Sequence, residues 1–161
     1  MDSPAPDLEV EREALGDALA AEFEREALEG IAHRWIVAGW QRGDAEAVLA
    51  MYAPDFVDLG NPSGQLGTRE ENVAGIRGLY DAFPDFHATI EELVIDEMAA
   101  SVAIRWSAVG THRGPFFGVA PTGKEISFRG IEILHIRDGG IVQRSGEWDA
   151  YGLLRQLGVV G

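Results

Sequence analysis

Two acids near the end of the chain are spaced so that they could do chemistry together. Glu147 and Asp149 flank Trp148 in the segment RSGEWDAYGLLRQLG, residues 144–158. Residues two apart in a β-strand point to the same face of the sheet, so we expect both carboxylates on one face. Two carboxylates in an apolar pocket repel each other and lose hydration, which raises the pKa of at least one and suits acid–base catalysis near neutral pH. The alternative is a strand end at the surface, with both acids solvated.

Three further polar residues could accompany this pair. Ser145 is predicted on the same strand face as the two acids. His135, in GIEILHIRDGG, lies across a predicted hairpin from the Glu147 strand and could come close to it, although a strand histidine also serves in packing or at a sheet edge. Asn61 belongs to the GNPSG loop, where turn formation alone is enough to explain an asparagine.

The sequence lacks the motifs that hold metals, dinucleotides or nucleotide phosphates. The chain has no cysteine, which excludes disulfides, a catalytic thiol and thiolate metal sites. Its histidines show no H-x-x-x-H spacing. No G-x-G-x-x-G, G-x-x-x-x-G-K-[ST] or G-x-S-x-G occurs. We therefore expect no metal, no bound cofactor and no serine nucleophile of the hydrolase type.

Charge and composition favour a small, weakly charged ligand over a polyanionic partner. The 161-residue chain carries a net charge of −14, and 46% of its residues are hydrophobic. Nucleic acid and anionic membranes repel such a surface. No apolar run approaches the roughly 20 residues that span a bilayer, and the acidic start of the chain is unlike a secretion signal. We expect a cytoplasmic protein that binds a small molecule, with neither nucleic acid nor membrane as a partner.

The acids are concentrated at the N-terminus, which divides the chain into two predicted regions. Residues 1–29 hold ten acidic and two basic residues, a net charge of −8. Apolar residues recur every four positions from a helix start at Asp7, and they form one stripe: Leu15, Leu19, Phe23, Ala27, Ile31 and Trp35. We predict an acidic extension over residues 1–29, partly disordered or helical, that could lie on a partner subunit. Residues 30–161 form the predicted domain.

Helices precede strands in the predicted order of elements. Four helices are predicted: the first ends at residues 41–44, a short one runs from Asp44 to Tyr52, a third from Thr68 to about Phe83, and a last one follows residue 149. The third begins with a capping box between Thr68 and Glu71. The predicted strands are 55–59, 87–95, 101–112, 124–137 and 141–149, with a hairpin turn at RDGG. This order is typical of an α+β fold in which helices pack on one face of a curved sheet and enclose a pocket.

A long loop and several aromatic residues are expected near that pocket. The loop HRGPFFGVAPTGK, residues 112–124, carries Phe116 and Phe117 side by side. A loop that exposes two phenylalanines should cover a ligand or another subunit. Most aromatic residues of the chain are ordinary core; those expected near the pocket include Tyr52, Tyr80 and Trp106.

Several of these segments together resemble a known family. The resemblance rests on FPD, GTHRGPFFGVAPTGK, GIEILHIRDGGIV and the closing GLLRQLG within residues 83–158, and it extends back through GDAEAVLAMYAPDFVD, residues 43–58. The sequence resembles the SnoaL-like polyketide cyclase family, a branch of the NTF2-like superfamily. The resemblance implies a cone-shaped barrel with a curved, mostly antiparallel sheet, helices packed on its concave face, and a deep apolar pocket. It also implies a homodimer.

The resemblance implies a reaction and assigns residues to it. Well-known members close a ring of a polyketide by intramolecular aldol condensation, without metal or cofactor. By position, Asp149 matches the family's acid–base aspartate, His135 its supporting histidine and Asn61 a loop asparagine. The residues expected to bind substrate are Glu147, Ser145, Trp106, Phe116, Phe117, Tyr52 and Tyr80. Where relatives commonly have EHW, this chain has QRS at 143–145, so the substrate and the reaction could both differ.

Other activities use the same kind of pocket. An isomerase would return the proton elsewhere, an epoxide hydrolase would activate water, and a hydroxylase-like enzyme would direct oxygen addition. An inward arginine or asparagine beside Asp149, placed to hold water, would favour these readings. A non-catalytic small-ligand binder is a further alternative, and both acids on the solvent face would favour it over catalysis by this pair.

Overall fold

A computed structural model describes residues 8–60 and 64–161, and in it most helices precede most strands. The helical elements are α1 (Leu8–Trp35), the π-helix η1 (Ile36–Gln41), α2 (Ala45–Met51), α3 (Arg69–Ala82) and α4 (Ala150–Leu157). The strands are β1 (Tyr52–Asp58), β2 (His87–Asp96), β3 (Ser101–Thr111), β4 (Glu125–Arg137) and β5 (Gly140–Trp148). Element types and their order agree with the sequence prediction, and β1 begins three residues earlier than predicted.

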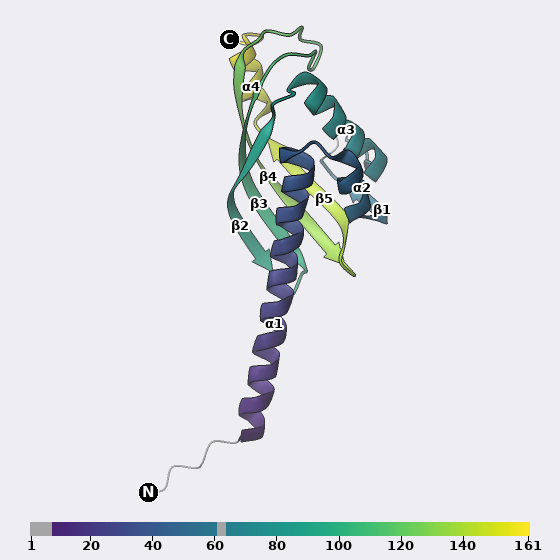
Figure 1. Ribbon diagram of the computed structural model, residues 1–161, viewed down its shortest axis with the longest axis vertical. Helices are drawn as coiled ribbons and strands as arrows, with labels where there is room; N and C mark the ends of the chain where they lie inside the picture. Colours follow the sequence, from purple (N-terminus) through teal and green to yellow (C-terminus); the bar gives the residue numbers. More distant parts are fainter. Residues whose placement is uncertain (1–7, 61–63) are drawn as a thin grey trace, which may run out of the picture.

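The strands form one curved, mostly antiparallel sheet (Figure 1). Its order is β1-β5-β4-β3-β2, with β1 parallel to β5 and every other neighbouring pair antiparallel. The predicted α+β class and the mostly antiparallel sheet are confirmed. Within the described residues β1 and β2 are the two edges and do not pair with each other, so the expected barrel stays open.

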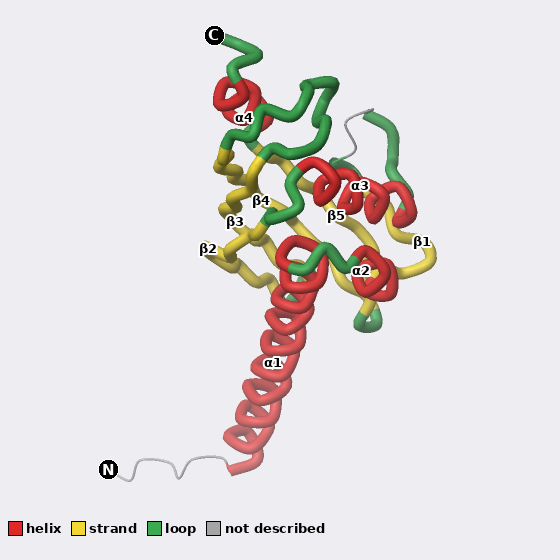
Figure 2. Tube along the Cα trace, turned by 45° about the horizontal axis from the view of Figure 1, so that its top comes forward, coloured by secondary structure: helices red, strands yellow, loops and turns green. Residues whose placement is uncertain are grey.

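Helices cover one face of this sheet. Figure 2 shows the end of α1, together with α2 and α3, on the same side of the strands, whereas α4 lies beyond the end of the sheet. The core between these helices and the sheet includes Trp35, Ile36, Phe83, Ile104 and Leu134, each at most 1% exposed. We call the sheet face that carries Ile104 and Leu134 the inner face, and the opposite one the outer face.

Short-range signals explain where several elements begin. The Asp44 side chain caps α2, and Thr68 and Glu71 form the predicted capping box at the start of α3. The turn between β4 and β5 holds Asp138 and Gly139 at φ values of 51° and 76°. Tight hairpin turns require this left-handed conformation, which Asp and Gly adopt more readily than most residues.

Only the end of α1 packs against the rest of the described chain. Residues 8–27 are exposed along their whole length, and Figure 1 shows this part of the helix extending past the sheet. Of the predicted apolar stripe, Ile31 and Trp35 are buried, whereas Leu15, Leu19 and Phe23 are between 48% and 72% exposed. The stripe therefore predicts the helix correctly, and its N-terminal half is exposed.

A bulge in β5 reverses the face predicted for the two acids. Ile136 pairs with Ile141, but His135 pairs with Gln143, so one extra residue lies between these pairs on β5. A one-residue shift moves every later side chain to the opposite face. Ser145 and Glu147, predicted to face the pocket, consequently lie on the outer face opposite the exposed Ile133 and Ile131. The inward prediction for these two residues is wrong.

Candidate active site

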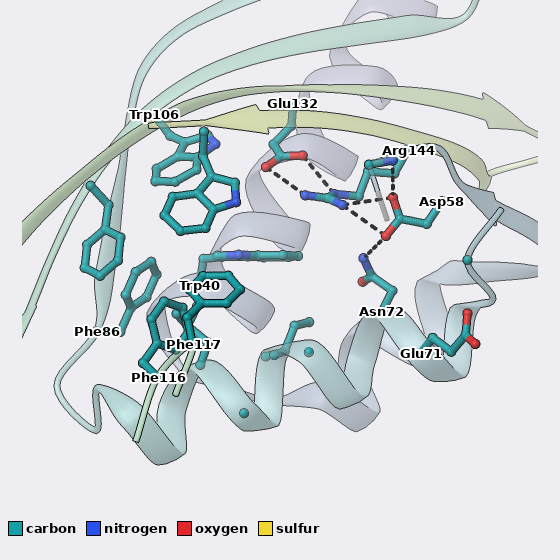
Figure 3. A pocket seen from close by; sticks show the side chains of 18 of the residues that line it. Trp40, Asp58, Glu71, Asn72, Phe86, Trp106, Phe116, Phe117, Glu132 and Arg144 are labelled. Carbon is teal, nitrogen blue, oxygen red and sulfur yellow. Dashed lines mark hydrogen bonds and ion pairs between the residues drawn. The ribbon is translucent and has the colours of Figure 1, made fainter. Parts of the chain in front are cut away.

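A cavity of about 500 Å3 lies between the inner face of the sheet, α3, η1 and the 112–124 loop (Figure 3). This volume is typical of small-molecule sites. Its aromatic lining consists of Trp40, Phe86, Trp106, Phe116, Phe117, Phe128 and Trp148. Its polar lining consists of Asp58, Glu71, Asn72, Glu132 and Arg144.

Tryptophans from β3 and β5 form part of the aromatic wall because a glycine separates them. Trp106 and Trp148 both pair with Gly130, which lies between them on β4. A Cβ atom at Gly130 would come within 2.6 Å of the Trp106 ring, so the missing side chain leaves room for the indole. The predicted loop residues complete the wall: Phe116 packs edge-on against Phe83, and Phe117 stacks on Trp148.

An arginine at the other end of the cavity is shared by two carboxylates (Figure 3). Arg144 Nη1 donates to both carboxylate oxygens of Asp58, at 2.9 and 3.0 Å. Arg144 Nη2 donates to Glu132 Oε1 at 3.1 Å, and Arg144 Nε lies 2.8 Å from Glu132 Oε2. The three side chains are 3% to 13% exposed. Removing so much charge from water is costly unless the groups pair with one another, as they do here.

Asp58 is fully occupied by its neighbours. Besides Arg144, its Oδ1 accepts from the Gly60 N–H at 2.9 Å and its Oδ2 accepts from Asn72 Nδ2 at 2.8 Å. These bonds use the four acceptor positions of a carboxylate. Asn72 is itself held by Tyr52, whose hydroxyl donates to Asn72 Oδ1 at 2.7 Å. Asp58 therefore anchors the arginine and has no acceptor position left for a ligand.

Glu132 has a different environment from Asp58. Burial raises the pKa of the Glu132 carboxyl above its ordinary value, while Arg144 and, to a smaller degree, the side chain of Trp106 oppose this shift. Burial also lowers the pKa of Arg144, but attraction by Glu132 and Asp58 outweighs it and raises that pKa overall. The guanidinium therefore stays charged, and the Glu132 carboxyl binds a proton more readily than an exposed carboxyl does.

Two glycines make room for the arginine. Arg144 reaches Glu132 diagonally across β5, passing over Gly146, which pairs directly with Glu132. A Cβ atom at Gly146 would lie 2.1 Å from Glu132 Oε2 and 2.4 Å from Arg144 Nη2. A Cβ atom at Gly60 would lie 3.0 Å from Arg144 Nη1. The ion pair can occupy this position only because both residues lack side chains.

The three residues predicted to be catalytic do not meet in this cavity. Asp149 lies in a shallow groove on the outer face, where it caps α4 by accepting from the Gly152 N–H at 2.8 Å and lies 3.3 Å from Arg129. His135 is also on the outer face and pairs with Gln143. From residue 143 to residue 149 a strand advances by about 20 Å, so the two side chains are far apart. Asn61 lies outside the described residues.

The predicted substrate-binding residues divide into three groups. Trp106, Phe116 and Phe117 line the cavity. Glu147 lies in the outer groove, and Ser145 is on the same outer face. Tyr52 and Tyr80 do not line the cavity. Tyr52 instead holds Asn72 through a hydrogen bond. Tyr80 is half-buried, and this burial raises the pKa of its hydroxyl to about 12.

The sequence prediction does not include the charged end of the cavity, although one signal, Glu132, points to it. Glu132 is an acid within the apolar run GIEILHI, and strand alternation puts it on the same face as the buried residues Phe128 and Leu134. Such a residue is almost never buried without a partner. Arg144 stands in the QRS segment where this chain departs from its relatives. Strict alternation predicts it on the outer face, and the bulge in β5 turns it inward.

The described residues contain neither a metal-binding cluster nor a membrane span. No group of three or more His, Asp or Glu residues in the ranges 8–60 and 64–161 is arranged to hold a metal ion. Within the same ranges, no helix is long and apolar enough to cross a membrane.

Comparison with known proteins identifies the family. A family model for the SnoaL-like polyketide cyclases matches residues 30–157. The chain belongs to the SnoaL-like polyketide cyclase family. It is therefore an enzyme of this cyclase family, and the fold and recognition predicted from the sequence are confirmed.

Relatives include two ester cyclases and one solved structure. The chain is 27% identical to nogalonic acid methyl ester cyclase of Streptomyces nogalater over 76% of this chain and 92% of that protein. It is 37% identical to aklanonic acid methyl ester cyclase AcmA of Streptomyces galilaeus over 87 residues, which span 54% of this chain and only 58% of AcmA. The structure of AclR, a candidate hydroxylase from Streptomyces galilaeus, has a TM-score of 0.77 and 26% identity, covering 85% of this chain and 88% of AclR.

The glycine that admits the ion pair gives a stability prediction. We expect Gly146→Ala to lower the free energy of unfolding by about 1–3 kcal/mol, because its Cβ would displace Glu132 or Arg144. Gly78→Ala is the matched control: a Cβ there meets open space, and alanine favours the helix interior by roughly 0.5–1 kcal/mol. Urea unfolding followed by circular dichroism measures both. Equal stability of Gly146→Ala and wild type would contradict the described packing.

Proposed function

We propose that this SnoaL-like enzyme closes a ring in an oxygenated, largely apolar small molecule, by removing a proton next to a carbonyl and then by intramolecular aldol addition. The observation that supports this most is the division of the cavity. Aromatic side chains form one end, and Asp58, Glu132 and Arg144 form the other. Fused rings can stack on the aromatic end while a carbonyl is held near the charged end. The two ester cyclases among the relatives point in the same direction.

The proposed contribution of the cavity is orientation combined with electrostatics. A flexible substrate that folds against Trp106 and Phe116 brings its two reacting carbons together, and such alignment accounts for a large share of the acceleration of intramolecular reactions. Negative charge develops on the carbonyl oxygen as the proton leaves. Fixed donors in a dry site stabilise that charge better than water does. No cofactor takes part in this proposal.

The roles that the resemblance gives to Asp149, His135 and Asn61 remain predictions. Asp149 and His135 lie on the outer face. Catalysis by Asp149 would place the reaction in the outer groove, and catalysis by His135 would place it elsewhere on the outer face, in neither case in the cavity. The cap that Asp149 provides for α4 is a sufficient structural reason for an aspartate at this position.

Hydroxylase-type chemistry is the second candidate, because the AclR structure is similar over most of the chain. An inward arginine or asparagine was expected to favour water or oxygen handling. Arg144 and Asn72 do face the cavity, but they lie beside Asp58 rather than beside Asp149. An oxidised product that carries one additional oxygen atom would distinguish this reaction from ring closure, which conserves the atoms of the substrate.

We also propose that the enzyme is a homodimer that packs through the outer face of the sheet. Val94, Val109, Ile131 and Ile133 are 40% to 59% exposed, and together they place apolar side chains on three adjacent strands. Exposed apolar patches of this kind mark interfaces. The cytoplasmic location expected from the sequence also remains a proposal.

The location of the reaction can be tested with two esters. We expect the wild type to convert nogalonic acid methyl ester or aklanonic acid methyl ester to a ring-closed isomer, in buffer with EDTA and no added cofactor. Gly75→Trp, which fills the cavity from α3, should lower kcat/KM at least tenfold. Asp149→Asn should retain the wild-type rate, because asparagine also caps helices. Mass spectrometry and chromatography of the product follow the reaction.

The opposite pattern would move the reaction to the outer groove. If Asp149→Asn abolished turnover while Gly75→Trp retained it, the cavity proposal would be wrong and the predicted role of Asp149 would be supported.

The dimer proposal predicts a change in sedimentation. Ile133→Lys places a charge among the exposed apolar residues of the outer face and should convert a dimer into a monomer of about half the mass. Met98→Lys is the control, because Met98 is fully exposed at the β2–β3 turn, away from that patch. Sedimentation velocity of all three proteins at one concentration decides the matter. A monomeric wild type refutes the proposal.

A further inference from the structure

We propose that Glu132 is the acid–base catalyst of the cavity and that Arg144 is its positioning residue. This inference rests on the proposed function, since it names the group that takes and returns the proton. It gives both roles to residues that line the cavity, in place of the Asp149 and His135 pair.

The geometry separates the two carboxylates of the cluster. Asp58 accepts four hydrogen bonds, from Arg144, Asn72 and the Gly60 N–H. In contrast, Glu132 Oε2 accepts no aligned hydrogen bond within the described residues, although it is buried and Arg144 Nε lies 2.8 Å away. A buried acceptor without an aligned donor is unusual and calls for an explanation. Glu132 also lines the cavity, and its carboxylate keeps acceptor capacity that Asp58 lacks, so it is the better proton acceptor of the two.

The charges of the cluster favour one mobile proton. One guanidinium faces two carboxylates, which leaves a net charge of −1 when both are ionised. A buried site with one uncompensated charge binds a proton more readily than an exposed carboxyl does. Tyr52 also acts on Arg144, and burial raises the pKa of Tyr52 further above its ordinary value, so it stays neutral. The extra proton therefore belongs to Glu132.

The proposed step conserves atoms and electrons. Ionised Glu132 takes a proton from a carbon next to a substrate carbonyl; the C–H bond breaks, an O–H bond forms on Glu132, and the electron pair moves to the carbonyl oxygen as an enolate. The enolate carbon then attacks a second carbonyl carbon, which forms the new C–C bond and an alkoxide. Protonated Glu132 returns its proton to the alkoxide. No oxidant, reductant or second substrate is required.

Arg144 acts through Glu132 rather than on the substrate. Its N–H groups are directed at Asp58 and at Glu132 Oε1. It therefore fixes the orientation of the Glu132 carboxyl and limits the rise of its pKa. Asp58, in turn, holds Arg144 in place and adds a negative charge that raises the pKa of Glu132.

The decisive variant is Glu132→Gln, which keeps the shape of the side chain and removes the base. We expect kcat for ring closure of nogalonic acid methyl ester to fall by about 10²–10⁴, with KM little changed. Deuterium incorporation next to the carbonyl in D2O, followed by NMR, should fall in parallel. Folding serves as the control: the variant should be at least as stable as wild type at neutral pH, because Arg144 then faces one carboxylate instead of two.

A second variant, Asp58→Asn, tests the role of Glu132 through the pH dependence of kcat/KM, which would not change if Glu132 had only a structural role. A general base must be ionised, so wild-type kcat/KM should rise with pH along a limb that lies above the ordinary carboxyl value of 4.5. Asp58→Asn removes a negative charge beside Glu132, which lowers the pKa of Glu132 and should shift this limb to lower pH. A limb that does not move in Asp58→Asn would overturn the assignment to Glu132.

Stability provides a measurement that needs no substrate. Because the folded-state pKa of Glu132 is raised, its protonated form stabilises the native state fully below the unfolded value of 4.5, and this contribution is lost as pH rises through the folded pKa. The free energy of unfolding of wild type relative to Glu132→Gln should therefore decrease as the pH rises above 4.5. A difference that is independent of pH would contradict the raised proton affinity.

The outcomes separate this inference from the proposed function. If wild type closes the ring and Glu132→Gln keeps more than a tenth of its rate, the inference is wrong and the cyclase proposal stands. If wild type only exchanges deuterium and Glu132→Gln does not, Glu132 is the base and the ring-closure proposal is wrong. If wild type neither closes the ring nor exchanges deuterium with either ester, both are overturned.

Discussion

The interaction on which the site depends is the sharing of one buried guanidinium by two carboxylates. Arg144 on β5 is held by Asp58 on β1 and by Glu132 on β4, and Asn72 ties the same cluster to α3. The cluster thus links three strands and the helix that covers them. It requires glycine at position 146, because any side chain there would collide with it. The polar end of the cavity is therefore fixed in shape before a ligand enters.

Stability alone is a poor explanation for this cluster. Replacing a buried ion pair by apolar residues of similar volume is often neutral or stabilising, whereas breaking such a pair is costly. Here the charges do not balance, and Glu132 carries a carboxyl of raised pKa at the edge of an aromatic cavity. Groups with such pKa values, desolvated and beside a specific charge partner, are typical of catalytic sites. The combination suits enolate chemistry on an apolar substrate.

Much of the fold was predictable from local sequence patterns, whereas the site was not. Capping residues and the RDGG turn located α2, α3 and the β4–β5 hairpin, and family segments identified the class. The faces of β5 were not predictable, because alternation has a period of two and the bulge before Gln143 inverts it without a glycine or proline to signal it. Because of that inversion, Arg144 faces the cavity, whereas Glu147 and Ser145, which were predicted to face it, lie on the outer face. The partners of Arg144 are Asp58 and Glu132, which lie far from it in the sequence, and no local sequence pattern predicts such distant pairing.

The most direct test of the account is a crystal structure of the enzyme with a bound ring-closed ester product. The account predicts that the ligand occupies the cavity, with its rings against Trp106 and Phe116 and the oxygen formed on ring closure within hydrogen-bond distance of Glu132. A ligand bound instead in the outer groove beside Asp149, with the cavity empty, would contradict it.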